Sequence, residues 1–418
     1  MRGRIGAVGL LWIISTGCVV ANPDYVPPLE GESDVGDETS AGTTIAPTGT
    51  STDAMTTGAS MTATASGSSS PATTEGATST TSAGSSTGTG LCEGPSVDVV
   101  VDPPDIMFIV DKSRSMFTRE WQGQNGLEPR WAGVHAALDG ALLDLQEEVF
   151  AGLVLSPQAM PIANSWSVCS INPEPPDVLP LQLAHDPIVD ALPPASPVIH
   201  TLYSSAGNPL TAAIEAATAT LAQFQGTWAQ FIVVLTDGAP NCAAEQEGNN
   251  PGPGLTTPDP SAVDAVIEAR GSGIFTLMVG VDVQAELPDA LLPWEPDVDP
   301  FELLTAMAIA GGLAQPEPDV FFNAQTASQL AVALGALERL GYCVLPALPE
   351  YAIELGVDDL DSVMIEVAGD PYFAVDSCPD EDGFVVVTSG AYTFVILCGL
   401  ACDDSVESGG ELVAVACE

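Results

Sequence analysis

Three oxygen-bearing side chains follow a short apolar run at alternate positions. The run is Ile106 to Val110, and Asp111, Ser113 and Ser115 come directly after it. A continuous apolar run of this length favours a buried strand of a parallel sheet. In open α/β sheets, ligands bind outside the carboxyl ends of such strands. Carboxylate and hydroxyl oxygens bind hard cations, so these residues predict a site for Mg²⁺, Ca²⁺ or Mn²⁺.

A second buried strand ends in a similar way. The stretch from Gln230 to Gly238 is apolar until it reaches Thr236, Asp237 and Gly238. Glycine lets the chain turn sharply at this point, which leaves Asp237 at the edge of the sheet. We therefore expect Asp237 to lie in a loop that converges with the one carrying Asp111.

Strands and helices alternate around these two stretches. The predicted strands are 106–110, 151–155, 178–183, 230–238, 274–281 and 320–322, and the predicted helices are 131–149, 212–224, 259–270, 301–310 and 328–340. Apolar residues recur at helical spacing in the first of these helices. The alternation predicts an α/β fold with a doubly wound, mostly parallel sheet, in which 178–183 is an edge strand.

Past Cys343 the pattern changes to short apolar runs between clusters of Asp, Gly and Pro. The runs are 363–367, 384–387, 392–397 and 412–415. They predict a small β-rich module without helices over 345–418, stapled by disulfides because so small a core gains from them. The α/β domain is expected over 91–344.

The first 18 residues have the features of a secretory signal. Arg2 and Arg4 precede an apolar stretch, Ile5 to Ile14, that is too short for a permanent membrane span. The ending at Cys18 after Thr-Gly resembles a bacterial lipoprotein box, although Ser15 stands where that box usually has Leu. We expect an exported chain, either a lipoprotein of the outer membrane or cell surface or, alternatively, a secreted protein.

Residues 19–90 have the composition of a linker. Ser, Thr, Ala and Gly dominate, and Pro and acidic residues come first. Such a segment cannot bury enough apolar surface to offset its conformational entropy, so we expect it to be disordered and to act as a tether.

Cysteine usage agrees with export. Removing Cys18 from the nine cysteines leaves eight, an even number that predicts disulfides in an exported chain. Cys92 with Cys343 would join the ends of the α/β domain, and Cys169 with Cys242 would pin a Pro-rich excursion near the site. The other four, which we expect to pair within the last module, are Cys378, Cys398, Cys402 and Cys417.

The charge balance excludes one class of partner. The chain has 8 Lys+Arg and 56 Asp+Glu, a formal net charge of −48. This surface repels phosphate backbones, so we expect no nucleic-acid binding, and it disfavours contact with anionic membranes except through a lipid anchor. The acidity indicates solubility in a salty or calcium-containing medium, or else capture of cations by the surface as a whole.

Three separated motifs together resemble a von Willebrand factor A domain over about Pro103 to Tyr342. They are Asp111-x-Ser113-x-Ser115 after a buried strand, the Gly-Asn-Pro loop before a helix, and Thr236-Asp237-Gly238 after the next buried strand. The longer sequence from Asp237 to Cys242 is similar to the exported, often lipid-anchored versions of this domain found in myxobacteria.

The resemblance implies a metal-ion-dependent adhesion site. Asp111, Ser113, Ser115 and Asp237 would hold a divalent cation, with Mg²⁺ the first choice. The family usually supplies a Thr hydroxyl where this chain has Asn208, so either Asn208 or Thr211 would provide the missing oxygen. An acidic group of a protein or glycan partner would complete the coordination shell.

Two alternatives remain open at this point. The α/β domain could instead be a structural envelope component that no longer binds metal. Lys112 and Arg114 either flank the site and attract an acidic partner or are solvated loop charges. An enzymatic function is not expected, because the three histidines are scattered and there is no phosphate-binding Gly-rich loop.

Changing Cys18 to Ser tests the lipid anchor. We expect the variant to leave the membrane fraction and to lose incorporation of a labelled fatty acid, because no thiol remains at the processing site. Ser15→Leu, which restores the usual lipoprotein box, is the matched control and should stay membrane-bound. If Cys18→Ser is processed and released like the wild type, the chain is not lipidated.

Overall fold

A computed structural model describes most of the chain from Cys92 to Cys417. The described residues are 92, 94–99, 101, 103–123, 126–145, 149–157, 169, 176–181, 184–195, 207–224, 229–242, 259–283, 299–315, 320–346, 362–376, 378, 382–389 and 392–417. The targeting segment with Cys18, and the linker predicted over 19–90, lie outside these residues.

A six-stranded sheet forms the centre of the α/β domain, in the order β6-β5-β2-β7-β8-β9. Its strands are β2 (Asp105–Asp111), β5 (Phe150–Ser156), β6 (Val178–Leu181), β7 (Gln230–Thr236), β8 (Ile274–Val281) and β9 (Phe322–Ala324). All neighbours are parallel except the edge strand β6, which is antiparallel to β5. The predicted α/β class with a mostly parallel sheet is confirmed.

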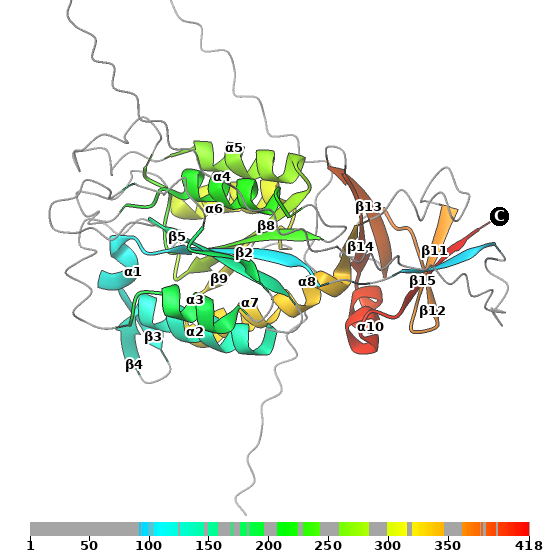
Figure 1. The fold of residues 1–418 in the computed structure, drawn as a ribbon, viewed down its shortest axis with the longest axis horizontal. Helices are drawn as coiled ribbons and strands as arrows, with labels where there is room; N and C mark the ends of the chain where they lie inside the picture. Colours follow the sequence, from blue (N-terminus) through cyan, green and yellow to red (C-terminus); the bar gives the residue numbers. More distant parts are fainter. Residues whose placement is uncertain are drawn as a thin grey trace, which may run out of the picture. The chain divides into compact units, whose positions relative to one another are not determined.

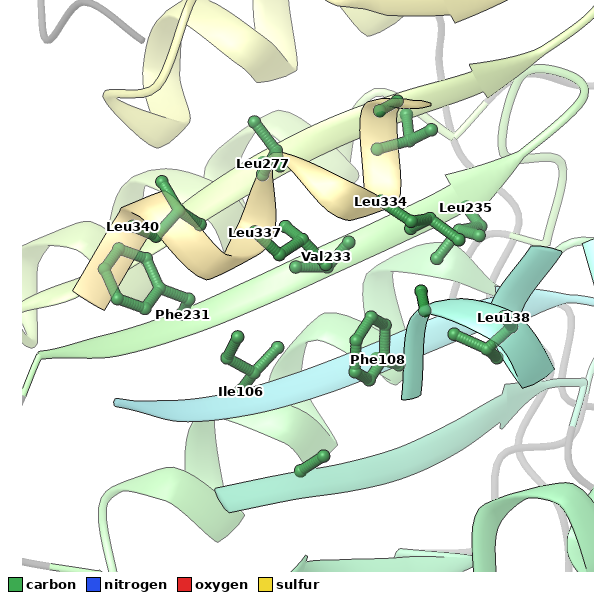
Figure 2. Packing of buried hydrophobic residues seen from close by; sticks show 14 of the residues in the cluster. Ile106, Phe108, Leu138, Phe231, Val233, Leu235, Leu277, Leu334, Leu337 and Leu340 are labelled. Carbon is green, nitrogen blue, oxygen red and sulfur yellow. The ribbon is translucent and has the colours of Figure 1, made fainter. Parts of the chain in front are cut away.

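Helices cover both faces of this sheet (Figure 1). One face carries α4 (Leu210–Leu221), α5 (Ser261–Gly271) and α6 (Pro300–Gly311), and the other carries α2 (Arg130–Leu145), α3 (His185–Ala191) and α7 (Ala327–Gly335). Alternate residues of β2 serve the two layers. Met107 and Ile109 pack under the first group of helices, whereas Ile106 and Phe108 pack under the second (Figure 2).

Several elements differ from the sequence prediction. The helix expected over 328–340 is two helices, α7 and α8 (Leu337–Cys343), separated at Ala336. The strand expected at 320–322 lies two residues later, as β9. The short helix α1 (Arg114–Thr118), the hairpin β3 (Glu120–Gly123) with β4 (Gly126–Pro129), and α3 were not predicted, because each is too short to show a period in sequence.

The last part of the chain, together with β1 from before the α/β domain, forms two small antiparallel sheets. One has the order β1-β15-β11-β12 and the other the order β10-β14-β13. The strands are β1 (Ser96–Val99), β10 (Val344–Pro346), β11 (Val363–Val367), β12 (Asp370–Phe373), β13 (Gly383–Ser389), β14 (Tyr392–Cys398) and β15 (Leu412–Ala416). A helix, α10 (Leu400–Ser408), corrects the prediction of a module without helices.

The sheet that contains β14 is buried on both faces. Phe394 and Ile396 belong to the apolar core that contains β2, α2 and α7, and the ring of Phe394 meets the edge of Phe275 with centroids 4.7 Å apart. Val395 and Leu397 point to the opposite side, into a separate core formed with β11, β15 and α10. This strand therefore joins two apolar cores, which explains its near-continuous apolar sequence.

Four disulfides join the eight cysteines other than Cys18, and two of them correct the predicted pairing. Cys169 pairs with Cys242, as predicted, and Cys378 pairs with Cys398 within the last module. Cys92 pairs with Cys417 rather than with Cys343, and Cys343 pairs with Cys402. The reason is that β1 lies antiparallel to β15, which brings the residues before and after these strands together.

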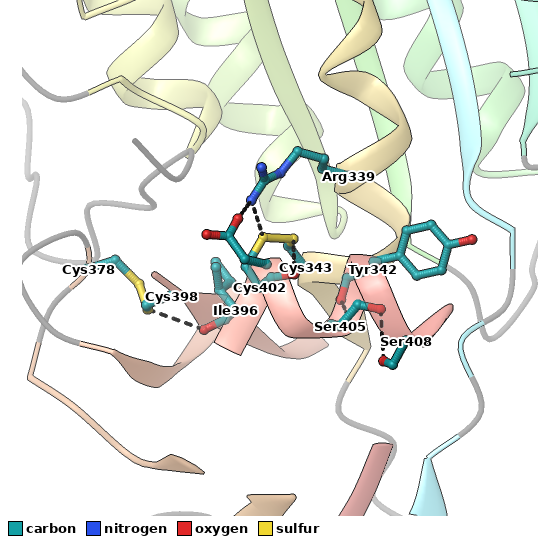
Figure 3. The surroundings of a disulfide bond; sticks show 10 residues. Arg339, Tyr342, Cys343, Cys378, Ile396, Cys398, Cys402, Ser405 and Ser408 are labelled. Atoms are coloured by element: carbon teal, nitrogen blue, oxygen red, sulfur yellow. Dashed lines mark hydrogen bonds and ion pairs between the residues drawn. A yellow bond between two sulfur atoms is a disulfide. The ribbon is translucent and has the colours of Figure 1, made fainter. Parts of the chain in front are cut away.

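Contacts around Cys343 and Cys402 fasten α8 to α10 (Figure 3). Arg339 forms an ion pair with Asp403, and the Ser405 hydroxyl donates to the carbonyl of Tyr342 at 3.0 Å. The disulfide thus lies within a set of polar contacts between the same two helices. Among the described residues, no helix is both long and apolar enough to cross a membrane.

Truncation of Phe394 tests whether the two cores unfold together. Phe394 is 3% exposed, so Phe394→Ala should lower the free energy of unfolding by about 3 kcal/mol. We expect a single urea transition, followed by tryptophan fluorescence and circular dichroism, to shift as a whole. Phe373→Ala is the matched control, because Phe373 is 42% exposed, and should change stability by less than about 1 kcal/mol. Two separate transitions would contradict the shared core.

Candidate functional site

Asp111 is the last residue of β2, and its carboxylate is held by donors from three segments. Its side chain is 1% exposed. The amide of Ser113 donates to Oδ1 at 2.6 Å, the Thr236 hydroxyl donates to Oδ2 at 2.6 Å, and Asn208 Nδ2 donates to Oδ2 at 3.0 Å. These bonds fix the orientation of a carboxylate that burial would otherwise leave without partners.

The two serines connect this loop to the carboxylate of Asp237. Ser113 Oγ lies 3.0 Å from Ser115 Oγ, and Ser115 Oγ donates to Asp237 Oδ1 at 2.7 Å. Both separations are those of ordinary O–H···O hydrogen bonds. The chemistry of these donors, a carboxylate and two hydroxyls, fits the predicted divalent cation.

Asn208 and Thr211 occupy different places relative to this cluster. Asn208 directs its amide nitrogen at Asp111 and Thr236, and its carbonyl oxygen accepts from Ser156 at 3.3 Å. In this orientation Asn208 acts as a donor that holds Asp111. Thr211, in the first turn of α4, donates to the buried carboxylate of Asp259 at 2.7 Å.

Hydrogen bonds also join the loop that carries Asn208 to the loop that follows β7 and carries Asp237. Asn241 Oδ1 accepts from the amide of Asn208 at 2.7 Å, and the amide of Asn241 donates to the carbonyl of Asn208 at 3.1 Å. The next residue, Cys242, forms the disulfide with Cys169. The loops that carry Asn208 and Asp237 are thus fixed to each other independently of any ligand.

Arg130 is a buried cation beside the cluster, and no sequence motif pointed to it. It is the first residue of α2 and is 3% exposed. Its Nη1 lies 2.8 Å from Asp237 Oδ2, and its Nη2 donates to the carbonyl of Asp282 at 2.9 Å and to the carboxylate of the same residue. Burial lowers the pKa of Arg130, but Asp237 and Asp282 outweigh this effect and raise it overall.

Lys112 does not face solvent as a loop charge would. Its side chain is 1% exposed. Burial lowers the pKa of Lys112 to about 8, partly opposed by the charge of Asp177. The suggestion that Lys112 attracts an acidic partner from the surface is therefore wrong, because the side chain is inside the domain.

The remaining polar residues of the site include several that sequence alone did not single out. Within the described part of the chain, no group of three or more His, Cys, Asp and Glu could hold a metal, so any cation here would depend on the serine hydroxyls. Thr236, Ser156, Asn241 and Asp282 were not predicted as ligands or partners of the site. A signal for Asp282 exists, since β2, β7 and β8 are each an apolar run with Asp at or directly after its end.

No protein-family model and no curated protein matches the sequence. Among solved structures, the pilus adhesin SpaC of Lactobacillus rhamnosus GG is 14% identical with a TM-score of 0.40 and covers 75% of this chain, which spans only 38% of SpaC.

Two other solved structures match a smaller share of this chain. The vWF domain of the type V pili tip protein Mfa5 from Porphyromonas gingivalis is 13% identical with a TM-score of 0.33. The match covers 58% of this chain and 95% of the Mfa5 chain. Proximal thread matrix protein 1 from the mussel byssus, with a zinc-occupied MIDAS motif, is 10% identical with a TM-score of 0.33 and covers 60% of this chain and 51% of its own. Likenesses this low say nothing about what the present chain binds.

The acidity of Asp111 gives a test in metal-free buffer. Burial, and then the charge of Asp237, raise the pKa of Asp111 from 3.8 to about 7. The folded state therefore favours the protonated carboxyl. The stability that this group contributes is complete below about pH 4 and is lost as the pH rises through 7.

Asp111→Asn should consequently gain stability over the wild type as the pH rises. The amide imitates the protonated carboxyl at every pH, so the difference in the free energy of unfolding should grow by about 3 kcal/mol between pH 4.5 and pH 8. Urea unfolding in the presence of EDTA measures it. Glu215→Gln, at an exposed position of α4, is the control and should give a nearly constant difference. A constant difference for Asp111→Asn would contradict the raised pKa.

Proposed function

We propose that this chain is an exported adhesion protein that binds a partner through a divalent cation at the carboxyl edge of its central sheet. Asp111, Ser113, Ser115 and Asp237 would hold the cation. The partner would be an extracellular protein or a glycan, and its acidic group would complete the coordination shell. The proposed site is of the metal-ion-dependent adhesion type (MIDAS).

One observation carries this proposal. Ser115 Oγ lies 3.0 Å from Ser113 Oγ and 2.7 Å from Asp237 Oδ1, in the loop that follows the buried carboxylate of Asp111 at the end of β2. Only two carboxylates belong to this donor set. A bound cation would therefore keep attraction for a further anionic ligand, because few protein charges neutralise it.

The composition of the donor set favours Mg²⁺. Mg²⁺ is usually bound through one or two carboxylates and keeps several waters, which suits a site with two carboxylates and two hydroxyls, whereas Ca²⁺ takes six to eight oxygen ligands. Mn²⁺ prefers similar oxygen donors and is the next choice, and Ca²⁺ is the third.

The proposed location is the outside of the cell. Four disulfides are typical of a chain that folds in an oxidising compartment. The signal-like start and Cys18 support anchoring by lipid, with membrane contact only through that anchor. The net charge of −48 argues against nucleic acid as a partner.

A binding role without catalysis is the second part of the proposal. Each ring nitrogen of His185 contacts a carboxylate: Nε2 lies 2.8 Å from Asp139, and Nδ1 lies 2.8 Å from Asp186. This arrangement suits a surface ion pair rather than a base that activates a nucleophile. The alternative function is a structural envelope component whose α/β domain has lost metal binding.

Removal of the serine hydroxyls tests the cation site. We expect the full chain to bind Mg²⁺ in isothermal titration calorimetry, and Ser113→Ala/Ser115→Ala to bind it at least tenfold more weakly, since two neutral ligands are lost at roughly 1 kcal/mol each. Ser272→Ala, at an exposed position after α5, should bind Mg²⁺ like the wild type. Equal affinity of the double variant and the wild type would exclude these hydroxyls as ligands.

The same protein distinguishes adhesion from the structural alternative. Capture of an extracellular partner should be lost when EDTA is added and should return with Mg²⁺. Capture that does not respond to chelation, together with no heat of Mg²⁺ binding, would favour the structural component.

A further inference from the structure

Arg130 places a permanent positive charge next to a carboxylate of the proposed cation site. Its guanidinium bonds Oδ2 of Asp237, while Oδ1 of the same carboxylate accepts from Ser115. Arginine stays charged at any ordinary pH, so this charge is present whether or not a metal is bound. The arginine would therefore bind one oxygen of the Asp237 carboxylate, and a divalent cation would bind the other.

The position of Arg130 is not explained by the stability of its helix. A cation at the first residue of α2 opposes the partial positive charge of a helix N-terminus. The neighbouring Trp131 fixes this end instead, because it stacks on Phe117 at 4.9 Å and donates Nε1 to the carbonyl of Pro193 at 2.9 Å. Arg130 is buried inside the domain, and its Nε has no hydrogen-bond partner among the described residues.

The balance of charge shows what the arginine does to the site. Asp111, Asp237 and Asp282, when ionised, carry three negative charges, and Arg130 offsets one of them. A divalent cation would then meet a net charge of −2 instead of −3, and it would leave the group neutral instead of at −1. Lowering the negative charge of a buried site weakens cation binding and strengthens the attraction of the bound cation for an anion.

We propose that Arg130 is a positioning residue that competes with the divalent cation for Asp237 and so keeps the intrinsic metal affinity low. This inference rests on the proposed cation site. A metal that the protein alone binds weakly is bound more tightly once an acidic group of the partner coordinates it. The charge of Arg130 therefore favours the complex of protein, metal and partner over the complex of protein and metal alone.

Asp282 gives the arginine a second anionic contact outside the donor set. It follows β8, and its amide donates to the carbonyl of Ala324 at 2.7 Å, which fixes its backbone. Because Nη2 bonds both the carbonyl and the carboxylate of Asp282, Arg130 remains compensated when Asp237 turns towards a cation. Release of Asp237 therefore does not leave a buried, unpaired guanidinium.

The test is the affinity for Mg²⁺ alone, measured by calorimetry on the full chain. Arg130→Met removes the charge and keeps much of the volume, and we expect it to bind Mg²⁺ at least roughly tenfold more tightly than the wild type. Arg130→Lys keeps the charge and should stay within about threefold. Arg119→Met removes a charge from a half-buried position nearby and should change the affinity by less than about twofold.

A second comparison protects the test against loss of folding. If circular dichroism shows that Arg130→Met is unfolded, Arg130→Met/Asp282→Asn removes one carboxylate together with the cation. It should bind Mg²⁺ roughly tenfold more tightly than Asp282→Asn alone. A purely structural role for Arg130 predicts the opposite direction in both comparisons, because a misplaced Asp237 binds metal more weakly.

The outcomes separate this inference from the proposed function. If the wild type binds Mg²⁺ and the arginine-free variants bind it no more tightly, the inference is overturned and the cation site stands. If only the arginine-free variants bind, the inference is supported and the cation site of the native chain is overturned. If no folded variant binds, both are overturned.

Discussion

Two buried carboxylates, those of Asp111 and Asp237, lie close together, and the structure depends on neighbouring groups that stabilise their negative charge. Both side chains are almost entirely removed from water, and the charge of Asp237 adds to the cost of ionising Asp111. The donors that Asp111 receives come from Ser113, Thr236 and Asn208, and the cation beside Asp237 is Arg130. Each of these contacts stabilises negative charge that is buried away from water, and a divalent cation would do the same.

The topology of the sheet creates this requirement. The strands β2, β7 and β8 are adjacent and parallel, so Asp111, Asp237 and Asp282 are brought to one edge. Apolar strands buried on both faces leave that edge as the place where polar groups can gather. Elsewhere in the domain the residues form apolar contacts. Phe394 on β14 packs against Phe275, so the core of the α/β domain extends to the last module.

Sequence patterns predicted the parts of this arrangement that have a strong local signal. The buried strand β8 was predicted to the residue, because its eight consecutive, largely apolar residues are bounded by Gly273 and Asp282. The loops converged as expected for Asp111 and Asp237. The partners of these carboxylates were harder to predict, because Arg130 lies 107 positions from Asp237 in sequence and only the tertiary fold brings them together.

The disulfides show a similar limit. Cys169 with Cys242 followed from the expectation that the Pro-rich excursion returns to the site, whereas the pairing of Cys92 depended on β1, which is only four residues long. Strand β1 lies alongside β15 at the far end of the sequence, so the α/β domain is inserted between β1 and the rest of the last module. A long-range pairing of this kind leaves no local periodicity to detect.

The use of Arg130 inside the domain is informative because cations are scarce in this chain. With 8 Lys+Arg and 56 Asp+Glu, a basic residue on the surface would relieve charge repulsion at little cost. A buried ion pair, in contrast, seldom stabilises a fold more than apolar side chains of the same volume would. Stability alone therefore does not account for a guanidinium between Asp237 and Asp282. Its placement is better explained by control of the charge at the sheet edge, where one oxygen of Asp237 faces the arginine and the other faces Ser115.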